Sequence, residues 1–156
     1  MISPEISAML MRNKRNFLIP ASQVASVNSD NSLTHALLVL TKIRYSRIPV
    51  LDHESKLVGE LSMPMITEQM LTLDDIDLQR LEGITIGDVM ATDVATITAP
   101  YDLEDVLHLL VDHPFLPVTA DDQTFEGIIT RREMMKSLNY LAHNFDKNAD
   151  LMDNRN

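Results

Sequence analysis

The stretch IPVLDHESKLVGELS, residues 48–62, occurs a second time in the chain as LPVTADDQTFEGIIT, residues 116–130. Both stretches have a glycine ten residues after their proline and a serine or threonine thirteen residues after it. In each stretch a polar turn separates two short apolar runs, which is the pattern of a β-hairpin. The sequence therefore predicts two copies of one hairpin, each ending at a residue that carries a hydroxyl group.

The repeat extends toward the N-terminal side of each hairpin. Residues 26–40, SVNSDNSLTHALLVL, align with residues 96–110, TITAPYDLEDVLHLL, at an offset of 70, whereas the hairpins align at an offset of 68. We expect this change to fall in the turn between a helix and a strand, because turns absorb deletions at small cost. Apolar residues at helical spacing follow Ser32 and Asp102, which we predict to be the N-caps of two equivalent helices.

Each copy is predicted to contain a short extended segment, a helix, the hairpin and a second helix. The predicted fold class is α/β (α+β), with two pseudo-symmetric repeats that each consist of a short three-stranded sheet packed by helices. The predicted organisation is an N-terminal helical segment over 1–16, a first repeat over 17–72, a helical linker over 73–86, a second repeat over 87–142 and a frayed polar tail over 143–156.

Composition limits the classes of function that remain. The 156 residues are 45% hydrophobic and carry a formal net charge of −10, which argues against nucleic acid or an anionic membrane as the partner. The chain has no cysteine, which excludes disulfides and thiolate metal sites. Without an apolar signal segment or a run of about 18 apolar residues, the chain is predicted to be cytoplasmic.

The two copies of strand, helix and hairpin, with TIGDVMATDVATI opening the second, resemble tandem CBS domains, which form a Bateman module, over roughly residues 17–142. Read as a stand-alone module with HALLVLT, YSRIPVLD, HPF and FEGIITRR, the chain is similar to small Gram-positive proteins that bind cyclic di-AMP. The resemblance implies a non-catalytic sensor and a homodimer, with no cofactor. Its expected regulatory ligand is cyclic di-AMP, in a cleft between the repeats.

The resemblance also implies where the nucleotide is contacted. The base is expected beside the first strand and the residues before the x-P-V proline of copy one. There Ala25 leaves room, Val27 and Ile48 provide apolar walls, and Tyr45 either stacks on a ring or donates a hydrogen bond through its hydroxyl. Copy two has HPFLP at residues 113–117, a bulkier and shorter loop, so the first pocket is favoured. The predicted nucleotide-binding residues are Gln23, Ala25, Val27, Tyr45, Ser46, Arg47, Ile48, Pro49, Ser62, Thr130, Arg131 and Arg132.

Two adjacent arginines, Arg131 and Arg132, follow the second hairpin of this acidic chain. Guanidinium groups bind phosphate oxygens bidentately, so we expect both arginines to hold the phosphates of the ligand. The family usually has a ribose-binding acid three residues after the hairpin hydroxyl, where this chain has Met65 and Glu133. This departure favours a dinucleotide over a mononucleotide.

Other interpretations remain open from the sequence. The chain could be a sensor of AMP, ADP or ATP, or a ligand-free dimerisation scaffold, and the paired arginines could simply pair with nearby acids. An enzyme is the least favoured class, because no nucleophile arrangement, metal-ligand spacing or glycine-rich phosphate loop is present. The acidic run Asp74, Asp75 and Asp77 is interpreted as a solvated helix start. A regulated partner enzyme is expected, with a (p)ppGpp synthetase as the hypothesis.

Overall fold

The computed structural model describes residues 1–12 and 17–144. The end of the predicted N-terminal segment, 13–16, and the predicted tail from 145 onward lie outside the described residues. In chain order the elements are α1 (Pro4–Arg12), β1 (Leu18–Pro20), the 3-10 helix η2 (Ala21–Gln23), β2 (Val27–Asn28), α2 (Leu33–Ile43), β3 (Arg47–Leu51), β4 (Leu57–Ser62), α3 (Met63–Met70), the 3-10 helix η3 (Leu78–Leu81), α4 (Ile86–Val89), β5 (Ile97–Thr98), α5 (Leu103–Asp112), β6 (Phe115–Thr119), β7 (Phe125–Thr130) and α6 (Arg131–His143).

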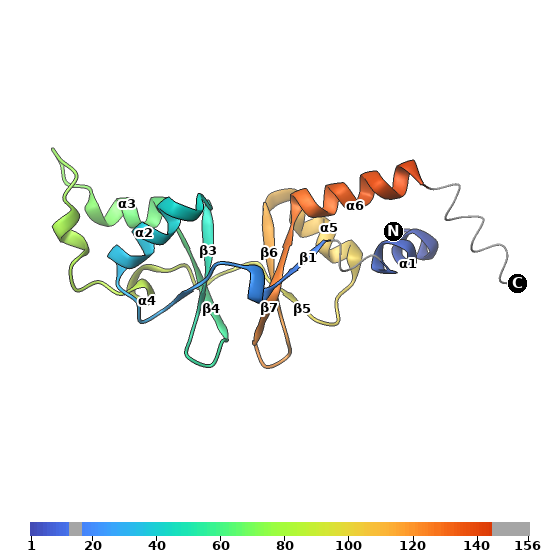
Figure 1. Cartoon of the computed structure of the whole chain (residues 1–156), viewed down its shortest axis with the longest axis horizontal. Helices are drawn as coiled ribbons and strands as arrows, with labels where there is room; N and C mark the ends of the chain where they lie inside the picture. Colours follow the sequence, from blue (N-terminus) through green and yellow to red (C-terminus); the bar gives the residue numbers. More distant parts are fainter. Residues whose placement is uncertain (13–16, 145–156) are drawn as a thin grey trace, which may run out of the picture. The chain divides into compact units, whose positions relative to one another are not determined.

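The chain forms two compact units, each with its own hydrophobic core. Among the described residues, unit 1 contains 1–12, 17–23, 95–118 and 126–144, and unit 2 contains 24–94 and 119–125. Each unit has a small sheet with helices packed against it, as the element labels in Figure 1 show. The predicted α/β fold of two sheet-and-helix repeats is confirmed.

Unit 2 contains a three-stranded mixed sheet in the order β2-β3-β4. Strand β2 runs parallel to β3, and β3 pairs antiparallel with β4 in a register that places Arg47 opposite Ser62. Helix α2 begins as predicted, because the Ser32 hydroxyl accepts a hydrogen bond of 3.1 Å from the His35 N–H. The apolar face of α2 is buried with the sheet in the core of this unit.

Unit 1 contains most of a four-stranded sheet in the order β1-β7-β6-β5, one strand more than the sequence predicts. The additional strand is β1, which pairs antiparallel with β7 and places Leu18 opposite Ile129. Helix α5 begins as predicted at Asp102, whose carboxylate accepts a hydrogen bond of 2.9 Å from the Glu104 N–H. Helix α1 packs on α6, and Phe17 is fully buried in the core that these helices share with the sheet.

A glycine of each hairpin lies against the backbone of a segment from outside that hairpin. In unit 2, a Cβ atom on Gly59 would lie 2.6 Å from the carbonyl oxygen of Ala91, whose backbone exchanges two hydrogen bonds with Glu60. In unit 1, a Cβ atom on Gly127 would collide with the carbonyl oxygen of Ile19 in β1. The two glycines at equivalent positions of the repeat therefore allow equivalent backbone contacts.

The two-residue change in repeat offset has a local cause. Three residues, 44–46, connect α2 to β3, but only two residues, 113–114, connect α5 to β6. In addition, α5 ends one residue earlier in its repeat than α2 does, so the helix and the turn of the second copy are each one residue shorter. The change lies between helix and strand, as predicted.

The linker differs from the expected helix over 73–86. It contains the 3-10 turn η3, and α4 begins only at Ile86. Side chains compete for the backbone here: the Thr72 hydroxyl and the Asp77 carboxylate accept hydrogen bonds of 2.9 Å from the N–H groups of Asp75 and Gln79. Such local hydrogen bonds favour turns over a continuous helix.

We predict that Gly127→Ala destabilises the protein much more than Gly83→Ala. Both glycines have a positive φ, +151° and +75°, but a Cβ on Gly83 would meet nothing within 4 Å. The control should lose about 1 kcal/mol from backbone strain alone, and Gly127→Ala at least about twice that because it also forces β1 away from β7. Urea denaturation of both variants measures the difference. Equal losses would show that the approach of Ile19 is not the constraint.

Candidate functional site

The predicted site residues fall in both units, and each group is described by itself. In unit 2 they form what we call the strand group: Ala25, Val27, Tyr45, Ser46, Arg47, Ile48, Pro49 and Ser62. In unit 1 they form what we call the helix-start group: Gln23, Thr130, Arg131 and Arg132. The strand group surrounds the start of β3, and the helix-start group lies at the start of α6 and at Gln23, an exposed residue of η2.

The turn before β3 exposes two of the predicted residues. Helix α2 ends at Ile43 and is capped by Arg44, which adopts a left-handed conformation with a φ of 58° and donates its N–H to the Leu40 carbonyl at 3.0 Å. This conformation closes the helix and directs the chain into the extended strand. Tyr45 and Ser46 follow directly and are exposed, so both side chains are available to a ligand.

The predicted apolar walls are part of the core instead. Val27 is 4% exposed and Ile48 is fully buried, and both pack in the hydrophobic core of unit 2. Pro49 is buried as well, whereas Ala25 is half-buried. Packing of the strand against α2 therefore leaves little of the Val27 and Ile48 side chains for a base to contact.

Arg47 is held by an acid that sequence reasoning missed. Its Nη1 lies 3.4 Å from Oε2 of Glu60 on the neighbouring strand, and Glu60 is only 5% exposed. The repeat contained a signal, because the residue equivalent to Glu60 in the second hairpin is the apolar Ile128. An acid at a buried strand position indicates a paired charge.

The hydroxyl residue that ends each hairpin is a helix N-cap. The Ser62 hydroxyl accepts a hydrogen bond of 3.5 Å from the Met65 N–H at the start of α3, and the Thr130 hydroxyl accepts one of 3.1 Å from the Glu133 N–H at the start of α6. Each hairpin therefore leads into a helix N-terminus, whose partial positive charge attracts anions.

Arg131 has a structural partner. Its Nε donates to the Leu110 carbonyl at 2.7 Å and its Nη2 to the Val111 carbonyl at 3.0 Å, both in the last turn of α5. These carbonyls have no partner within the helix ladder, and the negative end of the helix dipole favours a cation there. The side chain of Arg131 thus joins the end of α5 to the start of α6.

Arg132 differs from its neighbour. It is exposed on the first turn of α6, and its side chain makes no hydrogen bond or ion pair in the described part of the chain. A cation at a helix N-terminus is unfavourable, so Arg132 stands where a bound anion would stabilise it. The two adjacent arginines therefore do not have equivalent surroundings.

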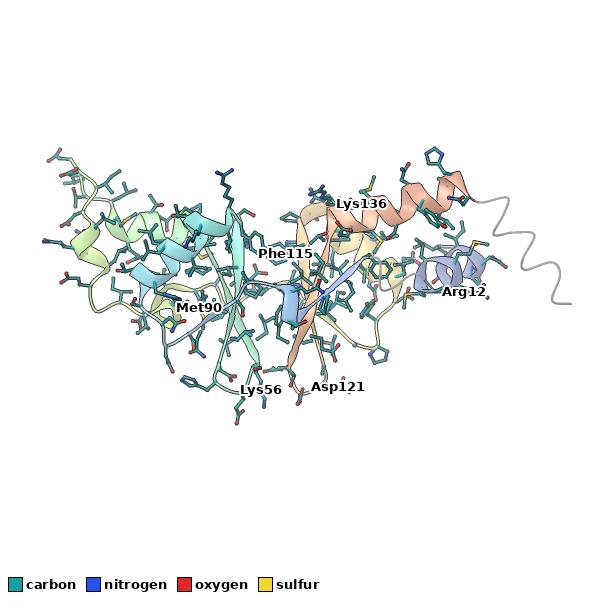
Figure 2. The ribbon with its side chains drawn as sticks, viewed as in Figure 1. Arg12, Lys56, Met90, Phe115, Asp121 and Lys136 are labelled. Atoms are coloured by element: carbon teal, nitrogen blue, oxygen red, sulfur yellow. The ribbon has the colours of Figure 1, made fainter. Side chains whose placement is uncertain are left out.

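The positions of the usual ribose-binding acid offer no free carboxylate. Met65 is half-buried at the start of α3. The carboxylate of Glu133 accepts a hydrogen bond of 2.8 Å from the ammonium group of Lys136. Figure 2 shows Lys136 on α6, one turn beyond the helix start.

Within residues 1–12 and 17–144, no group of three or more histidine, aspartate and glutamate side chains is placed to hold a metal ion. In the same residues, no helix combines the length and the apolar character that a membrane crossing requires.

Comparison with known proteins gives matches along most of the chain. The CBS domain family matches residues 16–75 and 86–140. The cyclic di-AMP receptor B of Bacillus subtilis is 37% identical over 147 residues, which cover 94% of this chain and 100% of that protein. The crystal structure of CbpB from Listeria monocytogenes in complex with c-di-AMP has a TM-score of 0.75 and 50% identity, covering 81% of this chain and 94% of that one. CbpB from Streptococcus agalactiae has a TM-score of 0.82 and 33% identity, covering 94% and 92%.

We predict that Arg131→Ala lowers the free energy of unfolding by about 1–2 kcal/mol, because two helix-end carbonyls lose a charged donor. Arg132→Ala should change it by less than about 0.5 kcal/mol. Urea denaturation without ligand compares the two. Equal losses would contradict a structural role that belongs to Arg131 alone.

Proposed function

We propose that this chain, which belongs to the family of CBS-domain proteins, is a non-catalytic receptor for cyclic di-AMP. The observation that carries the proposal is the match along 94% of the chain to a protein named as a cyclic di-AMP receptor. A relative of 50% identity that was solved with c-di-AMP adds support. In this role the chain signals through binding and does not transform the nucleotide.

The chemistry of the helix-start group fits a phosphodiester. The guanidinium of Arg132 has five N–H donors, none of them used within the described residues, next to the N-terminus of α6. We propose that Arg132 contacts phosphate directly, that Thr130 shapes the helix start, and that Arg131 positions this start through its bonds to α5. The roles of the paired arginines are therefore divided.

The strand group is proposed to receive an adenine base. Tyr45 offers an exposed ring for stacking, half-buried Ala25 leaves space beside the strand, and Ser46 offers a hydroxyl. Val27, Ile48 and Pro49 would contribute through their main chain, and Gln23, Arg47 and Ser62 remain proposed contacts.

The missing ribose acid also favours a cyclic dinucleotide. A mononucleotide presents a 2′,3′-diol, which a free carboxylate binds through two hydrogen bonds. In a 3′,5′-cyclic dinucleotide the 3′ oxygens are esterified, so this carboxylate is less important. Met65 has no carboxylate and Glu133 is paired with Lys136, so these two positions suit a cyclic dinucleotide better than a mononucleotide.

Calorimetric titration with cyclic di-AMP, AMP, ADP and ATP tests the proposal. We expect cyclic di-AMP to bind tightest and Arg132→Ala to weaken it about ten- to a hundredfold, from the loss of a charge-assisted contact of about 1.5–3 kcal/mol. Arg12→Ala is the matched control, because it removes an exposed arginine from α1 and should leave affinity unchanged.

Other outcomes would replace the proposal. Binding of AMP, ADP or ATP without cyclic di-AMP would identify an energy sensor. If no nucleotide binds or raises the melting temperature, the chain is better described as a dimerisation scaffold. At a hundredfold excess over its dissociation constant a true ligand stabilises the fold by about 2.7 kcal/mol, which a thermal shift detects.

We further propose that the chain forms a homodimer through its helices. The helices carry exposed apolar side chains: Leu38 on α2 is 65% exposed, Val111 on α5 74%, and Met135 and Tyr140 on α6 59% and 56%. Large apolar side chains left exposed on helices are typical of a surface that a partner covers. The expected cytoplasmic location and the hypothesis of a (p)ppGpp synthetase as the regulated enzyme remain predictions.

Light scattering tests the dimer. The wild-type protein should have about twice the mass of the 17.6 kDa chain, and Met135→Glu combined with Tyr140→Ser should shift it toward one chain. The exposed turn residue Asp121, labelled in Figure 2, provides the control variant Asp121→Ser. A wild-type protein that remains at the mass of one chain at high concentration would disprove the dimer.

A further inference from the structure

We propose that the 71–78 loop of unit 2 is a docking site for a partner protein whose contact surface is an apolar groove rimmed by lysine or arginine. The inference goes beyond nucleotide binding and does not depend on it. It rests on the exposure, the order and the charge of this loop.

The loop exposes apolar side chains to an unusual degree. Leu71 is 48% exposed, Leu73 103%, Ile76 60% and Leu78 61%. These four are among only ten large hydrophobic residues that are exposed in the described part of the chain, and they fall within eight consecutive positions. Single exposed leucines are ordinary, but four large apolar side chains exposed within eight positions of one loop indicate a contact surface.

The loop is ordered by its own bonds. Met70 and Leu81 are buried at its two ends, at 7% and 0% exposure. Between them, Thr72 donates its N–H to the Asp75 carbonyl at 2.9 Å, and the Asp77 N–H bonds back to Met70 at 2.9 Å. A loop that already holds its shape loses less conformational entropy when a partner binds.

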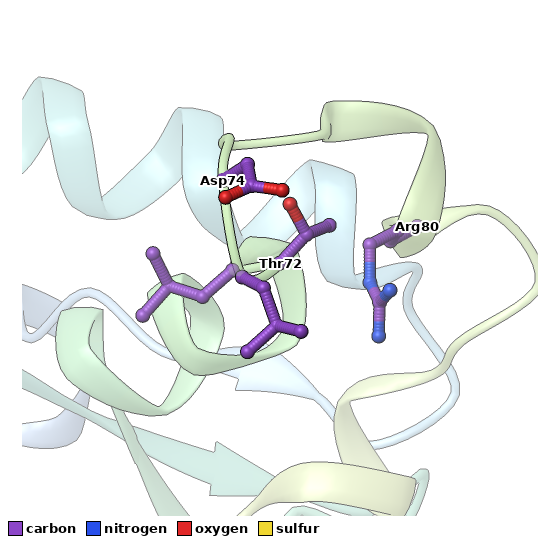
Figure 3. A pocket seen from close by; sticks show the side chains of 5 residues that line it. Thr72, Asp74 and Arg80 are labelled. Carbon is purple, nitrogen blue, oxygen red and sulfur yellow. The ribbon is translucent and has the colours of Figure 1, made fainter.

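A hollow of about 640 Å³ lies beside the exposed leucines. Figure 3 shows Thr72, Asp74 and Arg80 among the side chains that line it, together with Leu71 and Leu73. Arg80 is held at the rim, because its Nε donates to the Gln69 carbonyl at 3.1 Å. The loop therefore combines a protruding leucine side chain with a hollow lined by both polar and apolar side chains. An apolar groove on a partner protein could receive the leucine.

The charges of the loop select the kind of partner. The carboxylates of Asp75 and Asp77 accept hydrogen bonds from the N–H groups of Ile76 and Gln79, at 2.7 and 2.9 Å. Asp74 makes no hydrogen bond or ion pair within the described residues and stands beside the hollow. Self-association through this loop would place the three aspartates of each copy against one another, whereas a basic rim is complementary.

Site-specific photo-crosslinking of the full chain in its own cells tests this docking site. A benzophenone amino acid replaces Leu73, whose complete exposure makes the exchange harmless to the fold, and a second chain carries it at exposed Asp121 as the control position. Crosslinked peptides are identified by mass spectrometry. Asp74→Lys is then added to the first chain, with Asp93→Lys, an equal charge change at another exposed aspartate, as the matched variant.

We expect position 73 to crosslink to an apolar segment flanked by lysine or arginine in another protein. Asp74→Lys should reduce the yield at least about fivefold, in line with a lost charge pair of about 1 kcal/mol in the rim, and Asp93→Lys should not. Crosslinks only to a second copy, yields equal to those at position 121, or indifference to Asp74→Lys would overturn the proposal. Calorimetry of Asp74→Lys with cyclic di-AMP separates the two proposals, since loss of docking should leave nucleotide binding unchanged.

Discussion

Close approach of two backbones at a glycine is the constraint on which the sheets depend. Because Gly59 lacks a side chain, the backbone at Ala91 can lie directly against it, and Gly127 allows the same approach by Ile19 of β1. In both cases the approaching segment belongs to one repeat and lies against the hairpin of the other. Each exchange covers the outer edge of a hairpin, which would otherwise expose unpaired backbone groups. The sheet of the second repeat thus takes β1 from the first repeat, and the sheet of the first repeat is bridged at Glu60 by Ala91 from the second.

The same framework carries different chemistry in its two copies. Each hairpin ends in a hydroxyl that caps the following helix, but the first helix continues with Met63 and Pro64 and the second with Arg131 and Arg132. The two copies thus have the same kind of residue at the positions that shape the backbone but different residues at the positions next to them. As a result, only the second of the two helix starts carries exposed arginine side chains.

Much of this architecture followed from local patterns. The hairpins, the caps Ser32 and Asp102 and the place of the offset change were predicted, because each depends on residues within a few positions of one another. The charged linker was expected to be helical, but the Asp77 carboxylate and the Thr72 hydroxyl accept hydrogen bonds from the nearby backbone and favour turns. Val27 and Ile48 were expected at the ligand, yet packing against α2 buried them. The pattern of apolar and polar residues along a strand does not show which helix or strand will pack over a given side chain.

By itself the sequence determined that the chain is a duplicated sheet-and-helix unit, that its hairpins end at helix caps, and that two arginines start the last helix. These features are written in spacing and residue type. Only the tertiary structure decided that β1 joins the sheet of the second repeat, that Glu60 holds Arg47, and that the carbonyls of α5 engage Arg131 while leaving Arg132 available. Each of these contacts joins residues at least 13 positions apart in the chain, and distant segments meet only when the core closes around them.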